Sequence, residues 1–282
     1  MIEAEELPEL NRPIVIAAFE GWNDAGEAAT TVISHLAQVW GAEPVAAIDP
    51  DDYYDFQVNR PRISTVEGER RVTWPTTRIL LARQTGLGHD VLLIQGIEPS
   101  MRWRSFVIEL LGLAHEVDAE ILVLLGALLA DVPHTRPCPV MVTSEDRRLA
   151  HRYDLEPSTY DGHVGIVGVV ADAAHQSDLP TLSCWVSVPH YAGGHTSPKA
   201  ALALLSRVEE LLDLALPHGE LEELARAWER GVDELSGSDE EIAEYVQALE
   251  EAQDTAEHPQ ASGDAIAKEF ERYLRRREDD NR

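Results

Sequence analysis

Residues Pro13–Trp40 read PIVIAAFEGWNDAGEAATTVISHLAQVW, and this stretch decides the fold of the chain. Its first part, Ile14–Phe19, is a short apolar run of residues that suit a buried strand. A glycine-containing turn, Gly21–Gly26, follows it. Apolar residues then recur at three- and four-residue spacing up to Val39, which is typical of a helix. The order of strand, tight turn and helix predicts the first unit of an α/β sheet.

Segments typical of strands alternate with helical ones as far as about Leu216. We expect strands at Pro44–Asp49, Arg78–Arg83, Asp90–Gly96, Ile121–Ala130, Val140–Thr143 and Thr181–Val188, and a hairpin of Arg62–Val66 with Arg70–Trp74. We expect further helices at Arg102–Val117, Ser144–Arg152 and Val164–Ala174 and from Ser197 onward. The almost unbroken apolar run Ile121–Ala130 is typical of a central strand that helices cover on both faces. The fold class predicted for residues 1–216 is therefore α/β, a three-layer domain with a mostly parallel sheet.

The pattern changes at Pro217-His218-Gly219, and residues 217–282 form an acidic helical C-terminal region. Apolar stripes predict three amphipathic helices there, around Leu221–Leu235, Ile242–Leu249 and Ile266–Leu274. This helical appendage can pack on its own α/β domain or on a neighbouring subunit, and the sequence leaves both open.

Composition narrows the classes of partner. Among 282 residues there are 51 acidic and 23 basic side chains, a net charge of −28. This balance argues against a nucleic-acid or anionic-membrane partner, because no basic face is left to neutralise phosphates. An acidic surface favours solubility and partners with positive patches, although it also needs no partner at all.

The absence of targeting signals and of cysteine patterns predicts a cytoplasmic protein. The first residues lack a basic region followed by a long apolar one, and the run Ile121–Ala130 is too short to span a bilayer. Cys138 and Cys184 have neither zinc-site spacing nor the pattern of a disulfide framework.

Polar loops after the strands offer a candidate ligand pocket. The Gly21–Gly26 turn can present N–H groups to an anion at a helix N-terminus, but it matches neither the dinucleotide nor the Walker pattern. Asp24 competes for the same N–H groups as a helix cap, so a structural turn is favoured.

The acidic loop after Asp49 is a second candidate. Its carboxylates, Asp49, Asp51, Asp52 and Asp55, have the chemistry to ligate a hard divalent ion, but the spacing of a calcium loop is missing. Capping and solvation are favoured, and neither a metal nor another cofactor is expected.

Four histidines fall near strand ends or helix starts, namely His134, His163, His190 and His195. Sites in open α/β sheets form at that edge, so a general base there is conceivable. No G-x-S-x-G motif supplies a nucleophile, and no triad can be assembled. The alternative of an enzyme or small-ligand binder would use a pocket of Gly21, Asp24, Gly26, Asp52, His190 and His195.

Aromatic and arginine residues gather in other loops and suit the core of a protein interface. The candidates are Tyr53, Tyr54, Phe56, Arg60, Arg102, Trp103, Arg104 and Tyr191. Ordinary packing of aromatic side chains under loops explains the same pattern equally well.

Several of these loops occur together in a known order. The segments are GWNDAG at Gly21–Gly26, DPDDYYDFQVNRP at Asp49–Pro61, GIEPSMRW at Gly96–Trp103, LLGALLADVPHTRP at Leu124–Pro137, GIVGVVADAA at Gly165–Ala174 and WVSVPHYAGGHTSPKAALALL at Trp185–Leu205. Over roughly Pro13–Leu216 this combination resembles the proteasome assembly chaperone 2 family, in its single-chain bacterial and archaeal form.

The resemblance implies a fold similar to that of nucleoside phosphorylases and peptidyl-tRNA-hydrolase-like proteins, without an established catalytic site. It also implies a protein that assists or regulates proteasome assembly, with protein partners and a homo-oligomeric state. Some relatives end in a hydrophobic-tyrosine-any motif that inserts into the proteasome α-ring. The sequence here ends in Asp279-Asp280-Asn281-Arg282, so docking by that motif is not expected. A non-enzymatic protein-binding role is therefore the first expectation, with the phosphorylase-like pocket as the alternative.

Overall fold

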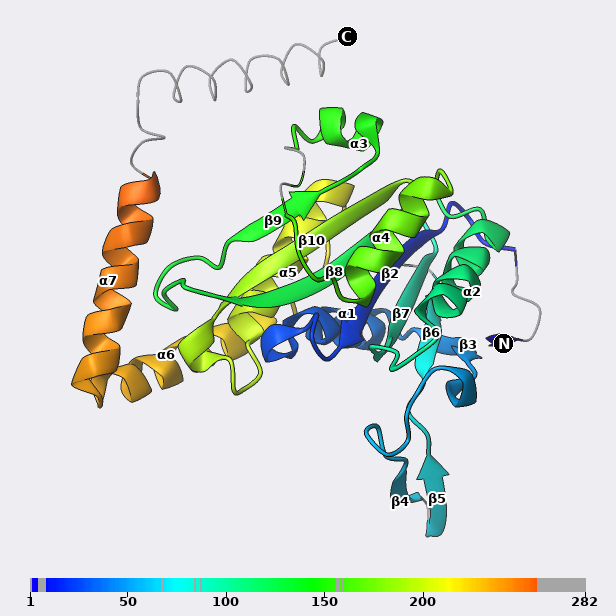
Figure 1. The fold of residues 1–282 in the computed structure, drawn as a ribbon, viewed down its shortest axis with the longest axis horizontal. Helices are drawn as coiled ribbons and strands as arrows, with labels where there is room; N and C mark the ends of the chain where they lie inside the picture. The colour runs from blue at the N-terminus through cyan, green and yellow to red at the C-terminus, as the bar shows by residue number, and fades with distance from the viewer. Residues whose placement is uncertain are drawn as a thin grey trace.

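The computed structural model of the chain describes residues 2–4, 9–66, 68–83, 85–86, 88–155, 158 and 160–257 (Figure 1). The apolar run of the opening motif forms β2 (Ile14–Glu20), which lies at the centre of the sheet. β2 pairs in parallel with β7 (Val91–Ile97) and β8 (Ile121–Ala130). β8 pairs in parallel with β10 (Thr181–Pro189). These four strands are largely buried, as expected for parallel strands covered on both faces.

Antiparallel strands complete the sheet on both sides, in the order β1-β3-β6-β7-β2-β8-β10-β9. On one side are β6 (Thr77–Ala82), β3 (Glu43–Ile48) and β1 (Ile2–Ala4), and on the other is β9 (Val140–Thr143). β1 was not expected from the sequence, because its residues are few and lie in an acidic stretch.

Helices cover both faces of the sheet (Figure 1). One core contains α1 (Ala28–Trp40) and α5 (Pro198–Leu212), and the other contains α2 (Trp103–Glu116) and α4 (Ile166–Gln176). Alternate residues of β2 divide between the two cores, because successive side chains of a strand point to opposite faces. The predicted α/β fold with three layers is therefore confirmed. The remaining short elements are α3 (Arg147–Arg152) and the 3₁₀ turns η1 (Ala25–Glu27), η2 (Pro50–Asp52) and η3 (His190–Ala192).

The predicted hairpin is present as β4 (Arg62–Val66) and β5 (Glu69–Thr73), which pair with each other in a separate two-stranded sheet. Figure 1 shows that this hairpin projects away from the body. We call residues 62–74 the arm.

Two helices follow the α/β body, α6 (Leu221–Gly237) and α7 (Glu240–Glu257). α6 packs against α5, and α7 packs against α6. Leu216 and Leu221 belong to the same core as α1 and α5, so the first tail helix packs on its own chain. The third predicted helix, Ile266–Leu274, lies outside the described residues.

Candidate functional site

The Gly21–Gly26 turn joins β2 to α1, and Asp24 is its cap. The Asp24 carboxylate accepts hydrogen bonds from the Ala29 N–H at 2.7 Å, the Thr30 N–H at 3.3 Å and the Thr30 hydroxyl. Burial raises the pKa of Asp24, and these hydrogen bonds oppose the shift. Because the N–H groups are already bound by Asp24, the geometry matches the capping role that the sequence favoured for this turn.

The same turn interlocks with the loop between β10 and α5. The carbonyl of Gly26 accepts from the Ser197 N–H at 2.7 Å. Gly26 has a φ of 59°, and a Cβ there would lie 2.9 Å from the Ser197 Cβ and 3.3 Å from the His195 carbonyl oxygen. Only glycine therefore fits this crossing.

A third contact ties the turn to the start of α4. The Glu98 carboxylate, just after β7, accepts from the Asn23 amide at 2.7 Å and from the Ile166 N–H at 2.8 Å. Asn23 is fully buried, and a Cβ on Gly165 would lie only 2.0 Å from its Oδ1. Three of the loop motifs thus meet at the carboxyl ends of β2 and β7, where open α/β sheets carry their sites.

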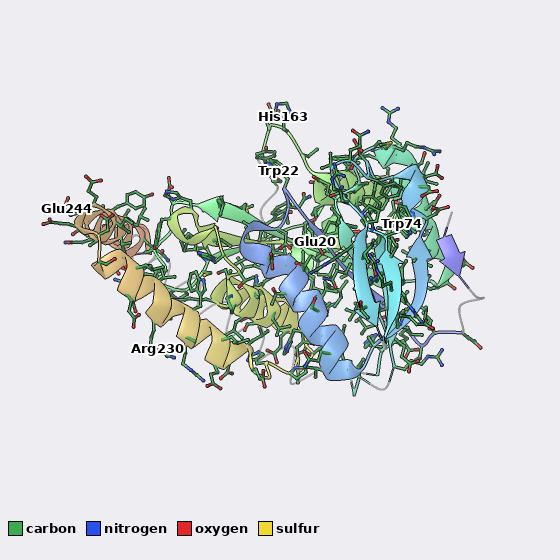
Figure 2. The ribbon with its side chains drawn as sticks, turned by 90° about the horizontal axis from the view of Figure 1, so that it is seen from below. Glu20, Trp22, Trp74, His163, Arg230 and Glu244 are labelled. Carbon is green, nitrogen blue, oxygen red and sulfur yellow. The ribbon has the colours of Figure 1, made fainter. Side chains whose placement is uncertain are left out.

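This rigid edge displays exposed apolar side chains. Trp22 is 65% exposed beside the buried Asn23, and Val164 is 50% exposed beside Gly165. Figure 2 shows Trp22 and His163 projecting at the same end of the molecule. We call Trp22, His163 and Val164 the edge patch. Trp22 is not among the residues predicted from the sequence, although it lies within the Gly21–Gly26 turn that was.

An acidic hollow of about 690 Å³ lies between α1 and the start of α6. Its lining includes Gly21, Asp24 and the carboxylates of Glu20, Glu27 and Glu220, together with the apolar Val39 and Leu224. Partial desolvation raises the pKa of Glu20, repulsion from Asp24 and Glu27 adds to the shift, and Arg78 opposes it. The hollow therefore has the chemistry to receive a cationic group flanked by apolar atoms.

The six residues of the predicted ligand pocket do not share one cavity. Gly21 and Asp24 line the acidic hollow. Gly26 and His195 meet at the crossing described above. Asp52 forms an ion pair with Arg102 near β3, while His190 is exposed, with its Nδ1 3.4 Å from Asp131. No cavity found in the described part of the chain is lined by all six.

Two of the predicted interface residues, Tyr53 and Tyr54, are buried, which fits the alternative of ordinary packing under loops. Tyr53 packs edge-on against Phe106, and Tyr54 bonds to Thr77 and to the Ile97 carbonyl. Phe56 packs edge-on against Trp74. Trp103 is half-buried and donates to the Pro99 carbonyl at 2.6 Å, and Tyr191 is half-buried as well. Arg60, Arg102 and Arg104 are exposed.

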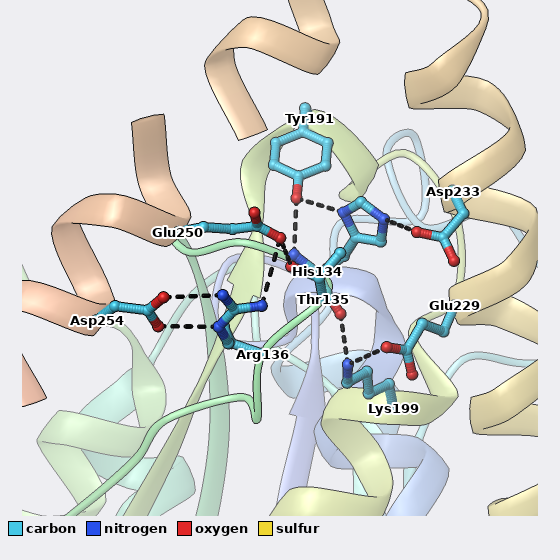
Figure 3. A network of polar contacts seen from close by, with 9 residues as sticks. All are labelled: His134, Thr135, Arg136, Tyr191, Lys199, Glu229, Asp233, Glu250 and Asp254. Carbon is cyan, nitrogen blue, oxygen red and sulfur yellow. Dashed lines mark hydrogen bonds and ion pairs between the residues drawn. The ribbon is translucent and has the colours of Figure 1, made fainter. Parts of the chain in front are cut away.

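His134 is buried in a polar network rather than free to act as a base (Figure 3). Its Nε2 lies 2.9 Å from Asp233 and its Nδ1 2.7 Å from the Tyr191 hydroxyl. Because a carboxylate only accepts, Nε2 carries a proton and donates to Asp233. The two ring nitrogens therefore hold the loop after β8 against α6 through Asp233 and against η3 through Tyr191.

The same loop also holds α7. Arg136 binds Asp254 through two contacts, and the Thr135 hydroxyl donates to Glu250 (Figure 3). Lys199 on α5 donates to the His134 carbonyl and pairs with Glu229 of α6 at 3.0 Å. We call this set of contacts around residues 134–136 the tail clamp.

The described residues contain no group of three or more His, Cys, Asp or Glu side chains placed to hold a metal ion. Burial raises the pKa of Cys138 to about 11 and that of Cys184 to about 12, so both thiols stay protonated at neutral pH. Within the same described residues, no helix is long and apolar enough to cross a membrane.

Comparison with family models and with solved structures identifies one family. A model described as the PAC2 family matches residues 18–236. A PAC2 family protein from Streptomyces avermitilis is 53% identical with a TM-score of 0.79, over 83% of this chain and 99% of that chain. A proteasome-assembly chaperone homologue from Mycobacterium tuberculosis is 46% identical with a TM-score of 0.75, over 83% and 99% of the two chains.

A more distant likeness concerns the fold alone. PbaB, an archaeal proteasome activator from Pyrococcus furiosus, is 17% identical with a TM-score of 0.66, over 83% of this chain and 98% of that chain. No curated protein matches the sequence.

Proposed function

Because this chain belongs to the PAC2 family, we propose that it is a non-enzymatic protein-binding chaperone that assists the assembly or regulation of a proteasome-type complex. The observation that carries this proposal is the 46% identity to a proteasome-assembly chaperone homologue, which extends over 99% of that chain. A cytoplasmic location, expected from the sequence, is part of the same proposal.

The edge patch supports a protein partner and supplies the contact in this proposal. Tryptophan is enriched among the residues that dominate binding energy at protein interfaces. Trp22 has 65% of its surface exposed. The next residue in the chain, Asn23, is buried and donates a hydrogen bond to Glu98. A partner therefore meets an apolar side chain on a backbone that is already ordered, which lowers the entropic cost of binding.

Charge supports the choice of partner class. The chain is strongly acidic, with a net charge of −28. We propose that a positive patch on a proteasome subunit or precursor is steered toward this acidic protein, and that the edge patch then provides the specific contact.

The proposal is tested by co-expressing the full chain with the proteasome α and β subunits of the same genome. Affinity capture of the tagged chain is followed by native mass spectrometry of the bound subunits. We expect wild-type protein to capture proteasome subunits or their precursors, and Trp22→Ala to reduce capture about tenfold or more, as for an interface hot spot.

Ile108→Ala is the matched control, because Ile108 is an apolar side chain of α2 that is 71% exposed and lies outside the edge patch. It should leave capture unchanged. Failure of the wild-type chain to capture any proteasome subunit would overturn the proposed function. Equal capture by wild type and Trp22→Ala would show that the edge patch is not the contact surface.

A further inference from the structure

A cavity of about 830 Å³ lies at the end of the sheet where β10 begins. Its floor comes from β9 and β10, and its walls come from α3, from the end of α4 and from the loop after α4 (Figure 1). Because β10, β8 and β2 run in parallel, this is the opposite end of the sheet from the edge patch. None of the predicted pocket or interface residues lines the cavity, so it is separate from every site described above. Its volume is typical of small-molecule sites.

Two hydroxyl groups lie side by side on the floor of the cavity. Ser183 of β10 and Thr143 of β9 are directly opposite each other in the antiparallel pair, so their Cβ atoms lie about 5 Å apart on one face of the sheet. The next residue of β10, Cys184, belongs to the core that contains α1 and α5, so Ser183 points to the other face, toward α4. Ser183 is only 7% exposed.

These two hydroxyl groups are open to a ligand. Neither the Ser183 nor the Thr143 hydroxyl makes a hydrogen bond to any residue that the structure describes. Polar side chains as buried as Ser183 usually have a partner, because an unpaired one loses its hydration without compensation. Thr181, which also lines the cavity and is equally buried, shows the usual arrangement, since its hydroxyl donates to the Leu179 carbonyl at 2.9 Å.

The charged side chains of the cavity lie at its rim, and their charges nearly cancel. Arg148 pairs with Asp146 at 3.0 Å, whereas within the described ranges Arg147 and Glu145 have no ion-pair partner. All the charged and titratable groups of the lining except Asp146 are exposed; the set is Glu145, Asp146, Arg147, Arg148, His175 and Asp178. Because basic and acidic groups are mixed, the rim favours neither a strongly anionic nor a strongly cationic ligand.

The floor restricts the ligand further. It offers hydroxyl groups without a charge, so an ionic group placed against Ser183 would lose its hydration without gaining an ion pair. A ligand hydroxyl suits the floor, because each hydroxyl group can donate one hydrogen bond and accept two. At the rim, carboxylates can accept from further ligand hydroxyls and a guanidinium can donate to them.

We propose that this cavity binds a small uncharged polyhydroxylated molecule, a sugar or a polyol. Ser183 and Thr143 bind its inner hydroxyl groups, and Arg147 and Glu145 bind its outer ones. The site goes beyond the proposed protein-binding function, and none of its residues belongs to the edge patch.

The test is an NMR titration of the isotope-labelled full chain with D-glucose and with maltose. We expect saturable shifts of the amide signals around Thr143 and Ser183, with a dissociation constant of about 10 mM or lower for at least one of the two sugars. The double variant Thr143→Val/Ser183→Ala should weaken binding about tenfold, because it removes two hydrogen bonds from the ligand. The amide spectrum of the same sample shows whether the variant is folded.

Matched controls separate the cavity from its surroundings. Ser187→Ala changes a half-buried serine of the same strand outside the cavity and should leave binding within about twofold of wild type. Arg147→Ala should weaken binding about threefold. Arg152→Ala, on the same helix but outside the lining, should leave it unchanged.

Inorganic phosphate and L-glutamine represent anionic and zwitterionic ligands, and both should bind more weakly than the sugars. The absence of saturable shifts with both sugars would overturn the proposal. Tighter binding of phosphate or glutamine than of either sugar would overturn it as well, and so would equal affinity of wild type and the double variant. Capture of proteasome subunits by the double variant should match that of wild type and reports on the proposed function separately.

Discussion

Arg136 and Asp254 face each other side-on, with the guanidinium Nε 2.9 Å from Oδ1 and Nη2 2.9 Å from Oδ2 of the carboxylate. This two-point contact joins the loop after β8 to α7. The pair is partly exposed, and Glu250 on the same helix lies 3.4 Å from the guanidinium. Polar contacts therefore hold α7 to the loop after β8.

Loss of this pair should release α7 without unfolding the sheet. We expect Arg136→Ala to cost about 1 kcal/mol locally, because the pair is partly screened by solvent. Hydrogen exchange should rise in residues 240–257 and stay unchanged in β2 and β8. Raised salt should act in the same direction on wild type. Uniform acceleration of exchange throughout the chain would contradict a local clamp.

Glu98 should be a main source of stability at the carboxyl edge. Glu98→Ala leaves the Asn23 amide and the Ile166 N–H without their acceptor, and we expect a loss of about 2 kcal/mol in the free energy of unfolding. Urea denaturation, monitored by circular dichroism, measures this loss in the free energy of unfolding. Glu116→Ala, an exposed carboxylate at the end of α2, is the control and should change stability by less than about 0.5 kcal/mol.

Replacement by alanine should lower the stability of the protein at Gly165 and raise it at Gly112. Gly165→Ala forces a Cβ against Asn23 Oδ1, so we expect a loss of about 1–3 kcal/mol. Gly112 lies within α2 with no atom near its Cβ position, so Gly112→Ala should stabilise the protein by about 1 kcal/mol. Thermal melting of the two variants checks both signs, and a gain in Gly165→Ala would show that the Asn23 contact is not tight.

His218 should make the α5–α6 junction sensitive to pH. Desolvation lowers its pKa, but Glu222 at 3.2 Å and Glu209 at 3.1 Å more than compensate, so the pKa in the folded protein is raised above 6.5. A raised pKa means that the folded state holds this proton more tightly than the unfolded state does. The contribution to stability is therefore complete below pH 6.5 and is lost as the pH rises through the folded pKa.

The variant His218→Gln isolates this effect. The stability difference between wild type and variant should grow as the pH is lowered through that window, as measured by urea denaturation. A difference that does not change with pH would contradict the assigned role of Glu209 and Glu222.

Much of the fold could be predicted from local sequence. The strands Ile121–Ala130 and Val140–Thr143 have the same bounds in the structure as in the prediction, because a continuous apolar run and β-branched residues are local signals. β1 was missed because pairing with β3, and not its own composition, makes it a strand.

The site was harder to predict, because it depends on segments that are distant in the chain. Tyr53 is buried by Phe106, which comes 53 residues later, and a loop sequence alone does not show that packing. The acidic hollow requires α6 beside α1. The capping role of Asp24 was a local inference from its position before a helix, and the observed hydrogen bonds fit it.

The fit between Asn23 and Gly165 also has an evolutionary consequence. Since a side chain at position 165 would occupy the space of the Asn23 amide, the two positions cannot change independently. Related sequences with a larger residue than glycine at position 165 should have a smaller residue than asparagine at position 23. This covariation would distinguish relatives that keep the contact between the two loops from relatives that pack this edge differently.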